Sequence, residues 1–414
     1  MNNILIIIYI ILLFDFLLER FLSILNSVKR NRKLPAELEG IYDNETYLKS
    51  LDYKREYENF GTIAATFSFI LIICMIIFQG FAFADQLARS ISENPILLCL
   101  IYFGLLVFVS DIIGTPFDLY STFIIEEKYG FNKTTPKLYI SDKLKGYLLG
   151  IIIGGGLLSV FIWFYLKVGN NFWIYIWIIF TAFSIFMSMF YSNLIVPLFN
   201  KQTPLEEGEL RQAITEFVTK AGFKLKNIYL IDGSKRSTKS NAYFTGLGPK
   251  KRIVLYDTLL KQLNTREIVA VLAHEVGHYK KKHTSIGIVT SIVQMGITLY
   301  ILSLFIGNPK LSEALSVYKP GIHIGLIVFG ILYSPISTII GLGMNMLSRK
   351  NEYEADRFAA SFDMAEDLIN ALKKLTVKNL SNINPHPAYV FLHYSHPTLL
   401  QRIRSLSKYL PGNK

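Results

Sequence analysis

Long apolar runs separated by polar segments are the strongest pattern in this sequence. A membrane-spanning helix needs about 20 mostly apolar residues, and seven runs reach that length. The first run starts directly after Asn3, without the basic n-region or cleavage site of a signal peptide, so we expect it to be retained. The pattern therefore predicts a mostly α-helical, polytopic membrane protein. The seven expected transmembrane helices are residues 3–25, 61–84, 96–117, 146–166, 172–195, 284–307 and 322–346.

Between and after these runs lie two polar stretches with shorter patterns. In the first stretch, apolar positions recur at helical spacing, and short β-branched and aromatic runs are typical of strands. A glycine-rich turn at 246–249 joins two of these strands into a β-hairpin. The expected elements are a helix at 205–222, strands at 227–231, 241–245 and 252–256, and a helix that begins at Thr265 and continues through His283 into the sixth span.

These patterns divide the chain into four regions. Residues 1–195 hold the first five spans, and residues 196–283 form a polar segment with the hairpin and a further helix. Residues 284–346 hold the last two spans, and residues 347–414 form a polar C-terminal segment. The two polar segments follow five and seven crossings, and because both numbers are odd, we expect both segments on the same side of the membrane.

Successive loops between the spans alternate between many and few lysine and arginine residues. Loops 27–60 and 118–145 hold seven and five basic residues, whereas loops 84–95, 168–171 and 308–321 hold one, none and two. Because basic residues gather in cytosolic loops, we expect the N-terminus outside, and both polar segments and the C-terminus in the cytosol.

The composition excludes several classes of protein. Hydrophobic residues make up 51% of the 414 residues and the mean hydropathy is +0.35, which excludes a disordered chain. The two cysteines, Cys74 and Cys99, lie in apolar runs and cannot build a disulfide scaffold. A net charge of +12 fits loops beside anionic membrane lipids better than nucleic acid, because no arginine-rich tract with interleaved aromatic residues is present.

Polar residues inside the expected spans have two explanations. They form hydrogen bonds between helices, or they line a water-filled cavity, and the pattern alone leaves both open. These residues are Asp15, Glu19, Asp111, Asp118, Asn193, Gln294 and Asn345.

The candidate chemistry lies in the sequence His274-Glu275-Val276-Gly277-His278. Two histidines four residues apart share one face of a helix, so that both imidazoles reach one zinc ion, and the glutamate between them is placed as a general base for water. The alternative is a surface helix with two unrelated histidines. Apolar residues before the motif, such as Val271 and Leu272, favour a covered site. We therefore expect one Zn²⁺ per chain.

A catalytic zinc site needs a third protein ligand and keeps one position open. Glu352 and Asp356 are four residues apart on an expected helix, which suits one carboxylate ligand and a second carboxylate that orients a histidine. Glu354 points elsewhere and is interpreted as a solvated charge. The other candidates for the third ligand are His386, His393 and His396.

Six stretches in a fixed order, together with the seven spans, are more specific than the zinc motif, which many unrelated peptidases share. They are Leu34–Tyr42, Leu119–Phe123 with Glu126–Asn132, Ser240–Phe244 with Lys251–Leu255, His274–His278, Glu352–Asp356 and Ser395–Arg402. On these stretches the chain resembles the CAAX prenyl protease type 1 (Ste24) family of integral-membrane zinc metalloproteases. The resemblance covers nearly the whole chain.

The resemblance implies an architecture and roles for single residues. The third zinc ligand is expected at Glu352, with Asp356 beside it as an orienting residue or proton donor. Asn241 is expected to hold the substrate peptide, and His396 and Arg402 to lie near the scissile bond. The implied fold is seven helices around a water-filled chamber, with the zinc site and a small β-hairpin at its cytosolic end. This favours chamber lining for the polar residues of the spans.

The leading hypothesis is a membrane-embedded zinc metalloendopeptidase that cleaves near the C-terminus of CAAX-type peptides or proteins, lipidated or not. Glu275 would take a proton from water and deliver it to the leaving amine, and His396 would stabilise the oxyanion. One alternative is a quality-control protease for damaged membrane proteins. Another, from a different class, is a transporter or inactive chamber protein with structural zinc. The abundance of Ile, Lys and Asn suggests a bacterial source and the inner membrane as its location.

Overall fold

The computed structural model describes residues 2–28, 43–223, 227–245 and 252–411. The first half of the described chain is helical, as its apolar runs predicted. Two π-helical segments, η2 (Ser121–Glu126) and η3 (Gly150–Gly155), and one 3-10 turn, η4 (Gly169–Asn171), connect some of its helices. The helices are α1 (Asn3–Val28), α2 (Asn44–Ile77), α3 (Gly80–Ile91), α4 (Pro95–Tyr120), α5 (Pro136–Leu149), α6 (Gly156–Val168), α7 (Phe172–Leu194) and α8 (Val196–Phe199).

The second half adds a small sheet, several short helices and two long ones. The sheet segment holds β1 (Gln202–Pro204), α9 (Glu209–Lys220), β2 (Asn227–Ile231), η5 (Gly233–Lys235), β3 (Ala242–Thr245), β4 (Arg252–Tyr256), α10 (Asp257–Gln262) and α11 (Thr265–Lys280). It is followed by α12 (His283–Phe305), α13 (Pro309–Ala314), α14 (Ile322–Ala360), α15 (Ala365–Lys378), α16 (Pro387–His393), α17 (Leu399–Leu406) and η7 (Ser407–Tyr409).

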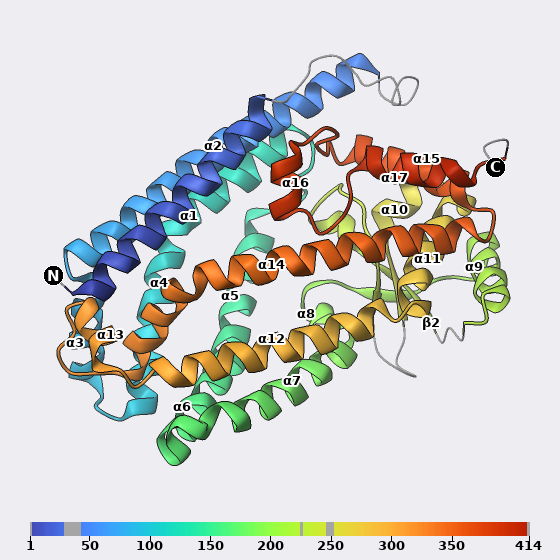
Figure 1. The fold of residues 1–414 in the computed structure, drawn as a ribbon. Coiled ribbons are helices and arrows are strands. Elements are labelled where there is room, and N and C mark those ends of the chain that lie inside the picture. The colour runs from blue at the N-terminus through green and yellow to red at the C-terminus, as the bar shows by residue number, and fades with distance from the viewer. Residues whose placement is uncertain (1, 29–42, 224–226, 246–251, 412–414) are drawn as a thin grey trace.

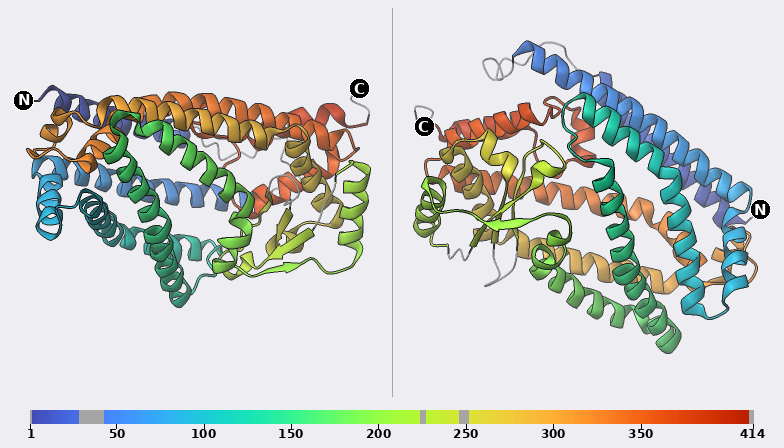
Figure 2. Two further views of the ribbon diagram at one scale, coloured as in Figure 1. Left: turned by 90° about the horizontal axis from the view of Figure 1, so that it is seen from below. Right: turned by 180° about the vertical axis from the view of Figure 1, so that it is seen from behind.

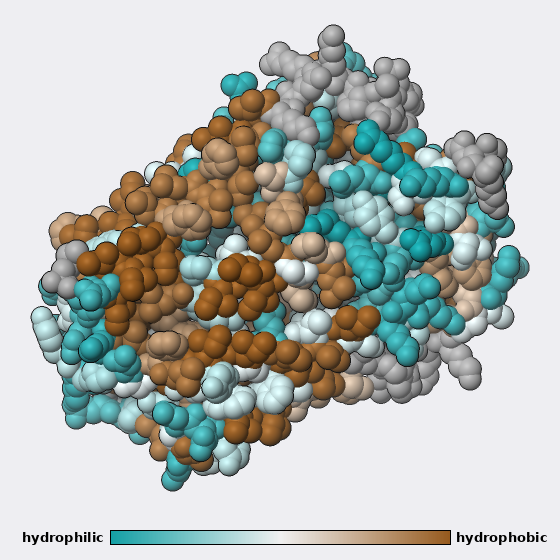
Figure 3. Space-filling model, viewed as in Figure 1, coloured by the Kyte–Doolittle hydropathy of each residue, from teal (hydrophilic) through white to brown (hydrophobic). Residues whose placement is uncertain are grey.

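The molecule has two ends of different character. α1 begins at one end, among long helices, whereas α17, α15 and α9 lie at the other end (Figure 1). The sheet lies at this second end, and α12 and α14 run side by side from one end towards the other (Figure 2). Hydrophobic side chains dominate the visible face over the long helices, and hydrophilic ones dominate around α15 and α17 (Figure 3). The apolar end is therefore separated from a polar end that carries the sheet.

Five helical stretches of the described chain are long and apolar enough to cross a membrane: residues 44–77, 95–126, 136–199, 283–305 and 322–360. Two predicted spans, the fourth and the fifth, fall within the single stretch 136–199, which turns back at Gly169 (φ +58°) between α6 and α7. The first predicted span coincides with α1, which lies outside these five because every 18-residue stretch of it contains Asp15, Glu19 and Arg20. These findings support a polytopic helical protein, and the count of seven crossings stays a prediction.

Polar side chains of the apolar helices make contacts between helices. The Ser334 hydroxyl of α14 donates to Asp15 of α1. Asp111 of α4 forms a 2.8 Å ion pair with Lys143 of α5. The Asn345 side-chain amide donates to the backbone carbonyl of Leu392, at 2.7 Å. For these residues, the first of the two explanations, hydrogen bonding between helices, is observed.

The sheet has the strand order β1-β2-β4-β3. β3 pairs antiparallel with β4, with Ala242 opposite Leu255, which confirms the strand pairing of the predicted hairpin. Its predicted turn at 246–249 lies outside the described residues. β2 and β4 are parallel and β1 is antiparallel to β2. The three-residue strand β1 was not predicted, because so short a segment shows no alternation. β3 is an edge strand, so one row of its backbone groups is not used by the sheet.

The helix that carries the histidine motif begins with a capping box. The Asn264 side chain accepts from the backbone N–H of Glu267, whose carboxylate accepts from the backbone N–H of Asn264. α11 ends at Lys280, and Lys282 adopts a left-handed conformation (φ +61°) before α12 starts at His283. The prediction of one continuous helix into the sixth span was therefore wrong. Apolar periodicity continues across the break, so the sequence pattern did not show it.

Residues 236–239, just before β3, fasten the sheet to the apolar helices. Arg236 forms ion pairs of 2.8 and 3.0 Å with Asp142 of α5. The Lys239 ammonium lies 2.8 Å from a carboxylate oxygen of Glu126 in η2 and 4.4 Å from the centroid of the Phe131 ring. The Tyr53 hydroxyl of α2 donates to the same carboxylate. The start of β3 is thus held by charged contacts with α5 and η2.

Candidate metal centre

α11 and α14 bring the histidine motif and a carboxylate together. Nε2 of His274 lies 3.1 Å from Nε2 of His278, and Nε2 of His278 lies 3.2 Å from Oε1 of Glu352. Nε2 of His274 lies 3.5 Å from Oε2 of Glu352. These three residues form a group whose ligand atoms all lie within 4.8 Å of one another. The spacing of the histidines and the choice of Glu352 thus converge on one point.

A glycine makes this approach of two helices feasible. Gly277 lies in α11 between the two histidines, and a Cβ added there would meet Cβ of Phe358 at 3.0 Å and the backbone of Ala355 at 3.1 Å. Both neighbours belong to α14, and neither atom can move aside without a shift of the helix. The absence of a side chain at position 277 therefore lets α14 lie close enough to place Glu352 beside the histidines.

Asp356 and Arg402 surround His274 on the side away from the other ligands. Nδ1 of His274 lies 2.8 Å from Oδ1 of Asp356, so a protonated Nδ1 donates to this carboxylate. Arg402 donates to both oxygens of Asp356, at 2.9 and 2.6 Å, and its guanidinium also lies 3.5 Å from Glu352. All four side chains are buried. Such a bidentate guanidinium–carboxylate pair fixes the carboxylate that in turn orients the imidazole.

The electrostatic balance of the site favours positive charge. Burial and the neighbouring Arg402 lower the pKa of His274, but the nearby carboxylates of Asp356 and Glu352 outweigh both effects and raise this pKa to about 9. Two buried carboxylates therefore attract positive charge to the place where the imidazoles meet.

The residues present fit a zinc ion. Zinc ligands lie about 2.0–2.2 Å from the metal, so neighbouring ligands of a tetrahedral site are about 3.3 Å apart, close to the separations of 3.1–3.5 Å here. Within the described part of the chain, Oε2 of Glu352 is a buried oxygen without a hydrogen-bond partner. Buried polar atoms of this kind call for an explanation such as an ion. Nitrogen and carboxylate donors are those that zinc prefers.

The other candidates for the third ligand have different partners. His386 caps α16 by accepting from the backbone N–H of Ala388. His393 lies 3.3 Å from Glu19 of α1. His396 does reach the site: its Nε2 lies 3.2 Å from Oε1 of Glu352, while its side chain is mostly exposed. It therefore lies at the open side of the three-residue group.

Glu275 lines a cavity of about 330 Å³ next to the candidate ligands. The cavity is open to the surface and is bordered by the end of α11, the start of α12 and the second half of α14, and it has space for several water molecules. It is lined by Glu275, His278, His283, Thr284, Gly287, Met344, Leu347, Ser348 and Asn351. Glu275 therefore lines open space beside the histidines, a position that would suit a general base for water.

The two predicted substrate residues lie in different settings. Asn241 is exposed at the start of the edge strand β3, and its side-chain oxygen accepts from the backbone N–H of Ala242. Arg402 is buried behind the candidate ligands, and its guanidinium donates hydrogen bonds to Asp356. The substrate contacts of both residues stay predictions. Because Arg402 contacts Asp356 and Glu352, we also expect it to help hold the candidate ligands in place.

Two residues near the site were not predicted. Nδ1 of His283 lies 3.1 Å from Nδ1 of His278, and Nε2 of His283 lies 3.2 Å from Oε2 of Glu354. The interpretation of Glu354 as a solvated charge was therefore wrong, because its carboxylate is only 32% exposed and pairs with His283. The sequence does contain a third histidine, five residues after the motif. In a continuous helix this residue would lie on another face, so only a break in the helix could bring it to the site.

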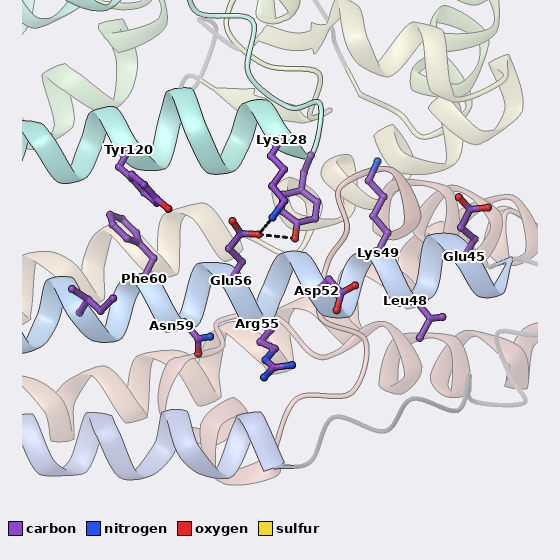
Figure 4. A pocket seen from close by; sticks show the side chains of 12 residues that line it. Glu45, Leu48, Lys49, Asp52, Arg55, Glu56, Asn59, Phe60, Tyr120 and Lys128 are labelled. Atoms are coloured by element: carbon purple, nitrogen blue, oxygen red, sulfur yellow. Dashed lines mark hydrogen bonds and ion pairs between the residues drawn. The ribbon is translucent and has the colours of Figure 1, made fainter.

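A second groove, of about 780 Å³, lies away from these residues, between α2 and the end of α4 (Figure 4). Within it, Lys128 and the Tyr129 hydroxyl both donate to Glu56 of α2. The groove shares no residue with the candidate metal centre. Its charges of both signs lie beside the apolar part of α2, as is common where a helix enters a membrane.

Comparison with known proteins defines the class of the fold and site. Residues 25–201 match the family model described as "CAAX prenyl protease N-terminal, five membrane helices", and residues 204–410 match the model of "Peptidase family M48". The chain is thus a membrane metalloendopeptidase. More particularly, it belongs to the CAAX prenyl protease 1 family within peptidase family M48.

Individual relatives are similar to this chain over most of their length. The "Probable CAAX prenyl protease 1" of Schizosaccharomyces pombe is 37% identical, over 90% of this chain and 82% of that protein. The "CAAX prenyl protease 1 homolog" of Arabidopsis thaliana is 37% identical over 90% of both chains. The crystal structure of S. mikatae Ste24p superposes with a TM-score of 0.93 at 34% identity, and covers 98% of this chain and 99% of that one.

These matches confirm the family and the enzyme class predicted from sequence. They also support a membrane protein with several membrane helices. The division of the chain into four regions stays a prediction. The relatives named here are eukaryotic, so they give no support to a bacterial source.

Proposed function

We propose that this protein is a zinc metalloendopeptidase that cleaves CAAX-type peptides or proteins near their C-terminus. The observation that carries the proposal is the convergence of His274, His278 and Glu352, with Glu275 beside them on a cavity. The substrate class comes from the names of relatives that the chain matches over most of their length. Zinc is the metal that this set of two imidazoles and one carboxylate suits best.

When bound, zinc would act as a Lewis acid that polarises the scissile carbonyl and makes a nearby water more acidic. Glu275 would accept a proton from the attacking water and pass it to the nitrogen of the leaving amine. The net reaction adds one water to one peptide bond and yields a carboxylate and an amine. His396, on the open side of Glu352, would face the oxyanion that develops on the carbonyl oxygen. Asp356 would hold the proton on Nδ1 of His274.

The peptide would bind along β3. An edge strand offers unpaired backbone N–H and C=O groups, to which an extended peptide adds as a further strand. Asn241 stands exposed where this strand starts, and its amide can both donate and accept. β3 also contacts α11, which carries the motif. Peptide addition to this edge would therefore direct the chain towards the histidines.

We further propose seven membrane crossings around a chamber, with the N-terminus outside and the metal centre and C-terminus in the cytosol. The distribution of basic residues over the loops supports this orientation. A variant with Cys74 and Cys99 replaced by serine would carry single cysteines at Lys310 or Tyr409. An impermeant thiol reagent on intact cells should label the first position only. Labelling at Tyr409 alone would reverse the orientation.

The test of the function uses a synthetic farnesylated peptide with a CAAX end. The purified protein should release one defined C-terminal fragment, which mass spectrometry identifies, and Glu275→Gln should release none at a comparable rate. Many products from an unfolded membrane protein, with no product from the CAAX peptide, would instead support the quality-control alternative. Absence of hydrolysis of either substrate by metal-loaded protein would contradict the proposal.

A further inference from the structure

His283, the first residue of α12, is a buried histidine that the proposed reaction does not use. Its ring touches two groups. Nδ1 lies 3.1 Å from Nδ1 of His278, and Nε2 lies 3.2 Å from Oε2 of Glu354 on α14. His278, His283 and Glu354 therefore form a continuous line from the candidate metal centre outwards.

This contact exists only because the helix is broken. In a continuous α-helix, with about 100° of rotation per residue, positions five apart differ by about 140° around the axis and their side chains diverge. Lys282, with φ +61°, ends the helical path and turns the chain, which brings His283 back onto His278. A left-handed conformation is unfavourable for a non-glycine residue, and such strain gathers at functional sites.

The protons along this line can be placed in one consistent way. Nε2 of His278 faces the other ligands, so Nδ1 carries its proton and donates to Nδ1 of His283. His283 then carries its own proton on Nε2, which donates to the Glu354 carboxylate. We infer that His283 and Glu354 are positioning residues that hold the ring of His278 for metal binding. The inference rests on the proposed metal set.

The contacts of His278 resemble those of His274, except that one more residue stands between the histidine and its carboxylate. His274 is oriented directly by the buried carboxylate of Asp356, whereas His278 is oriented through an imidazole by a carboxylate that is 32% exposed. Glu354 also lies 4.0 Å from Lys350, one turn away on α14. Because the outer end of this line is partly solvated, we expect His283 to matter more than Glu354. Loss of such outer partners typically weakens metal affinity by about 10–100-fold.

The experiment measures Zn²⁺ affinity of the full-length protein by competition with a chromophoric chelator. His283→Leu removes the acceptor for Nδ1 of His278, and we expect affinity to fall by about 10–100-fold. His283→Asn places an amide oxygen near the former Nδ1 and should restore most of this loss. Glu354→Gln keeps an acceptor for His283 and should lower the affinity less than His283→Leu does. His393→Asn is the matched control, since it removes a histidine–carboxylate pair away from the metal centre, and it should bind Zn²⁺ as the wild type does.

A second readout separates positioning from general stability. In Co²⁺-loaded protein, His283→Leu should shift the visible absorption bands, because the ring of His278 changes its angle at the metal. Wild-type affinity and spectrum in His283→Leu would overturn the inference. So would equal losses in the Leu and Asn variants accompanied by a matching fall in the Tm of metal-free protein, which would show a packing role. A wild-type protein that binds no Zn²⁺ would overturn the proposed function instead.

Discussion

Two buried clusters, near opposite ends of α14, contain the same three kinds of side chain. At one end, Asp356 lies between His274, at 2.8 Å, and Arg402, at 2.6 and 2.9 Å. At the other end, Asp85 lies between His323, at 2.7 Å, and Arg89, at 2.9 Å from both oxygens. Each carboxylate is thus shared by an imidazole and a guanidinium.

The clusters differ in what the second nitrogen of the imidazole faces. Nε2 of His274 faces His278 and Glu352, next to a cavity. Nδ1 of His323 faces Sγ of Cys99 at 3.8 Å, and the Tyr102 ring lies 4.5 Å from the His323 ring. Among the described residues, one group of donors meets the geometry of a metal site, and His323 is not part of it. The same charge arrangement therefore supports a ligand at one end and joins α3, α4 and α14 at the other.

Loss of a ligand should distinguish the clusters most clearly. We expect His278→Ala and Glu352→Ala to abolish stoichiometric zinc binding, because each variant keeps only two of the three donors. His323→Ala should keep one zinc per folded chain. Metal analysis of the purified proteins by mass spectrometry gives the answer. Full occupancy in both ligand variants would refute the assignment of the metal set.

Glu275→Gln should lower kcat by about 10²–10⁴-fold, the usual contribution of a positioned acid or base. Zinc content and Tm should stay at wild-type values, because the amide keeps the shape of the side chain. Steady-state cleavage of the lipidated peptide, together with metal analysis, checks this. Substantial turnover would mean that another group takes the proton from water.

Asp85→Ala should destabilise the protein by about 3–5 kcal/mol, because it leaves the buried His323 and the partly buried guanidinium of Arg89 without their carboxylate. A fall of Tm in detergent measures the effect. Zinc per folded chain should not change, since this cluster lies at the far end of α14. Asp52→Ala, at an acidic residue whose position lines the open groove on α2, is the control. Loss of zinc in folded Asp85→Ala would show that the two ends are coupled.

Asp356→Asn should weaken zinc binding by about 10–100-fold, since it removes the charged partner of Nδ1 of His274. Arg402→Ala should have an effect in the same direction, because Asp356 then loses its bidentate partner. Chelator competition measures both. If Arg402→Ala keeps its zinc affinity and loses only kcat/KM, its main role lies with the substrate, as the sequence analysis expected.

The smallest effect is expected at Asn241. Asn241→Ala should lower kcat/KM by about 5–10-fold, the equivalent of one hydrogen bond of roughly 1 kcal/mol. Its side chain is exposed and bonds only locally, so Tm and zinc content should not change. Kinetics with the lipidated peptide test this, with Asn227→Ala at the exposed start of β2 as a control. An altered zinc content would assign Asn241 to the structure of the site.

Features encoded within a few residues could be predicted from sequence. The histidine spacing, the carboxylates at 352 and 356, and the hairpin of β3 and β4 are all short-range patterns. Contacts between distant residues could be predicted only where the family resemblance implied them, as it did for Glu352 beside the histidines. Asp85 and His323 are 238 positions apart, and neither lies in a recognisable motif. The break at Lys282 was also missed, because a left-handed residue leaves no mark when it is not glycine.

α14 carries both His323 and Glu352, 29 positions apart, on one helix of 39 residues. At 1.5 Å per residue they are about 43 Å apart along the axis, and their angular relation is fixed by the number of residues between them. One residue inserted or deleted between them would rotate His323 by about 100° around the helix axis relative to Glu352. His323 could then no longer contact Asp85 while Glu352 contacts the histidines of α11. The length of this helix is therefore as strictly constrained as the identity of its polar residues, and tolerated insertions should fall in the loops around it.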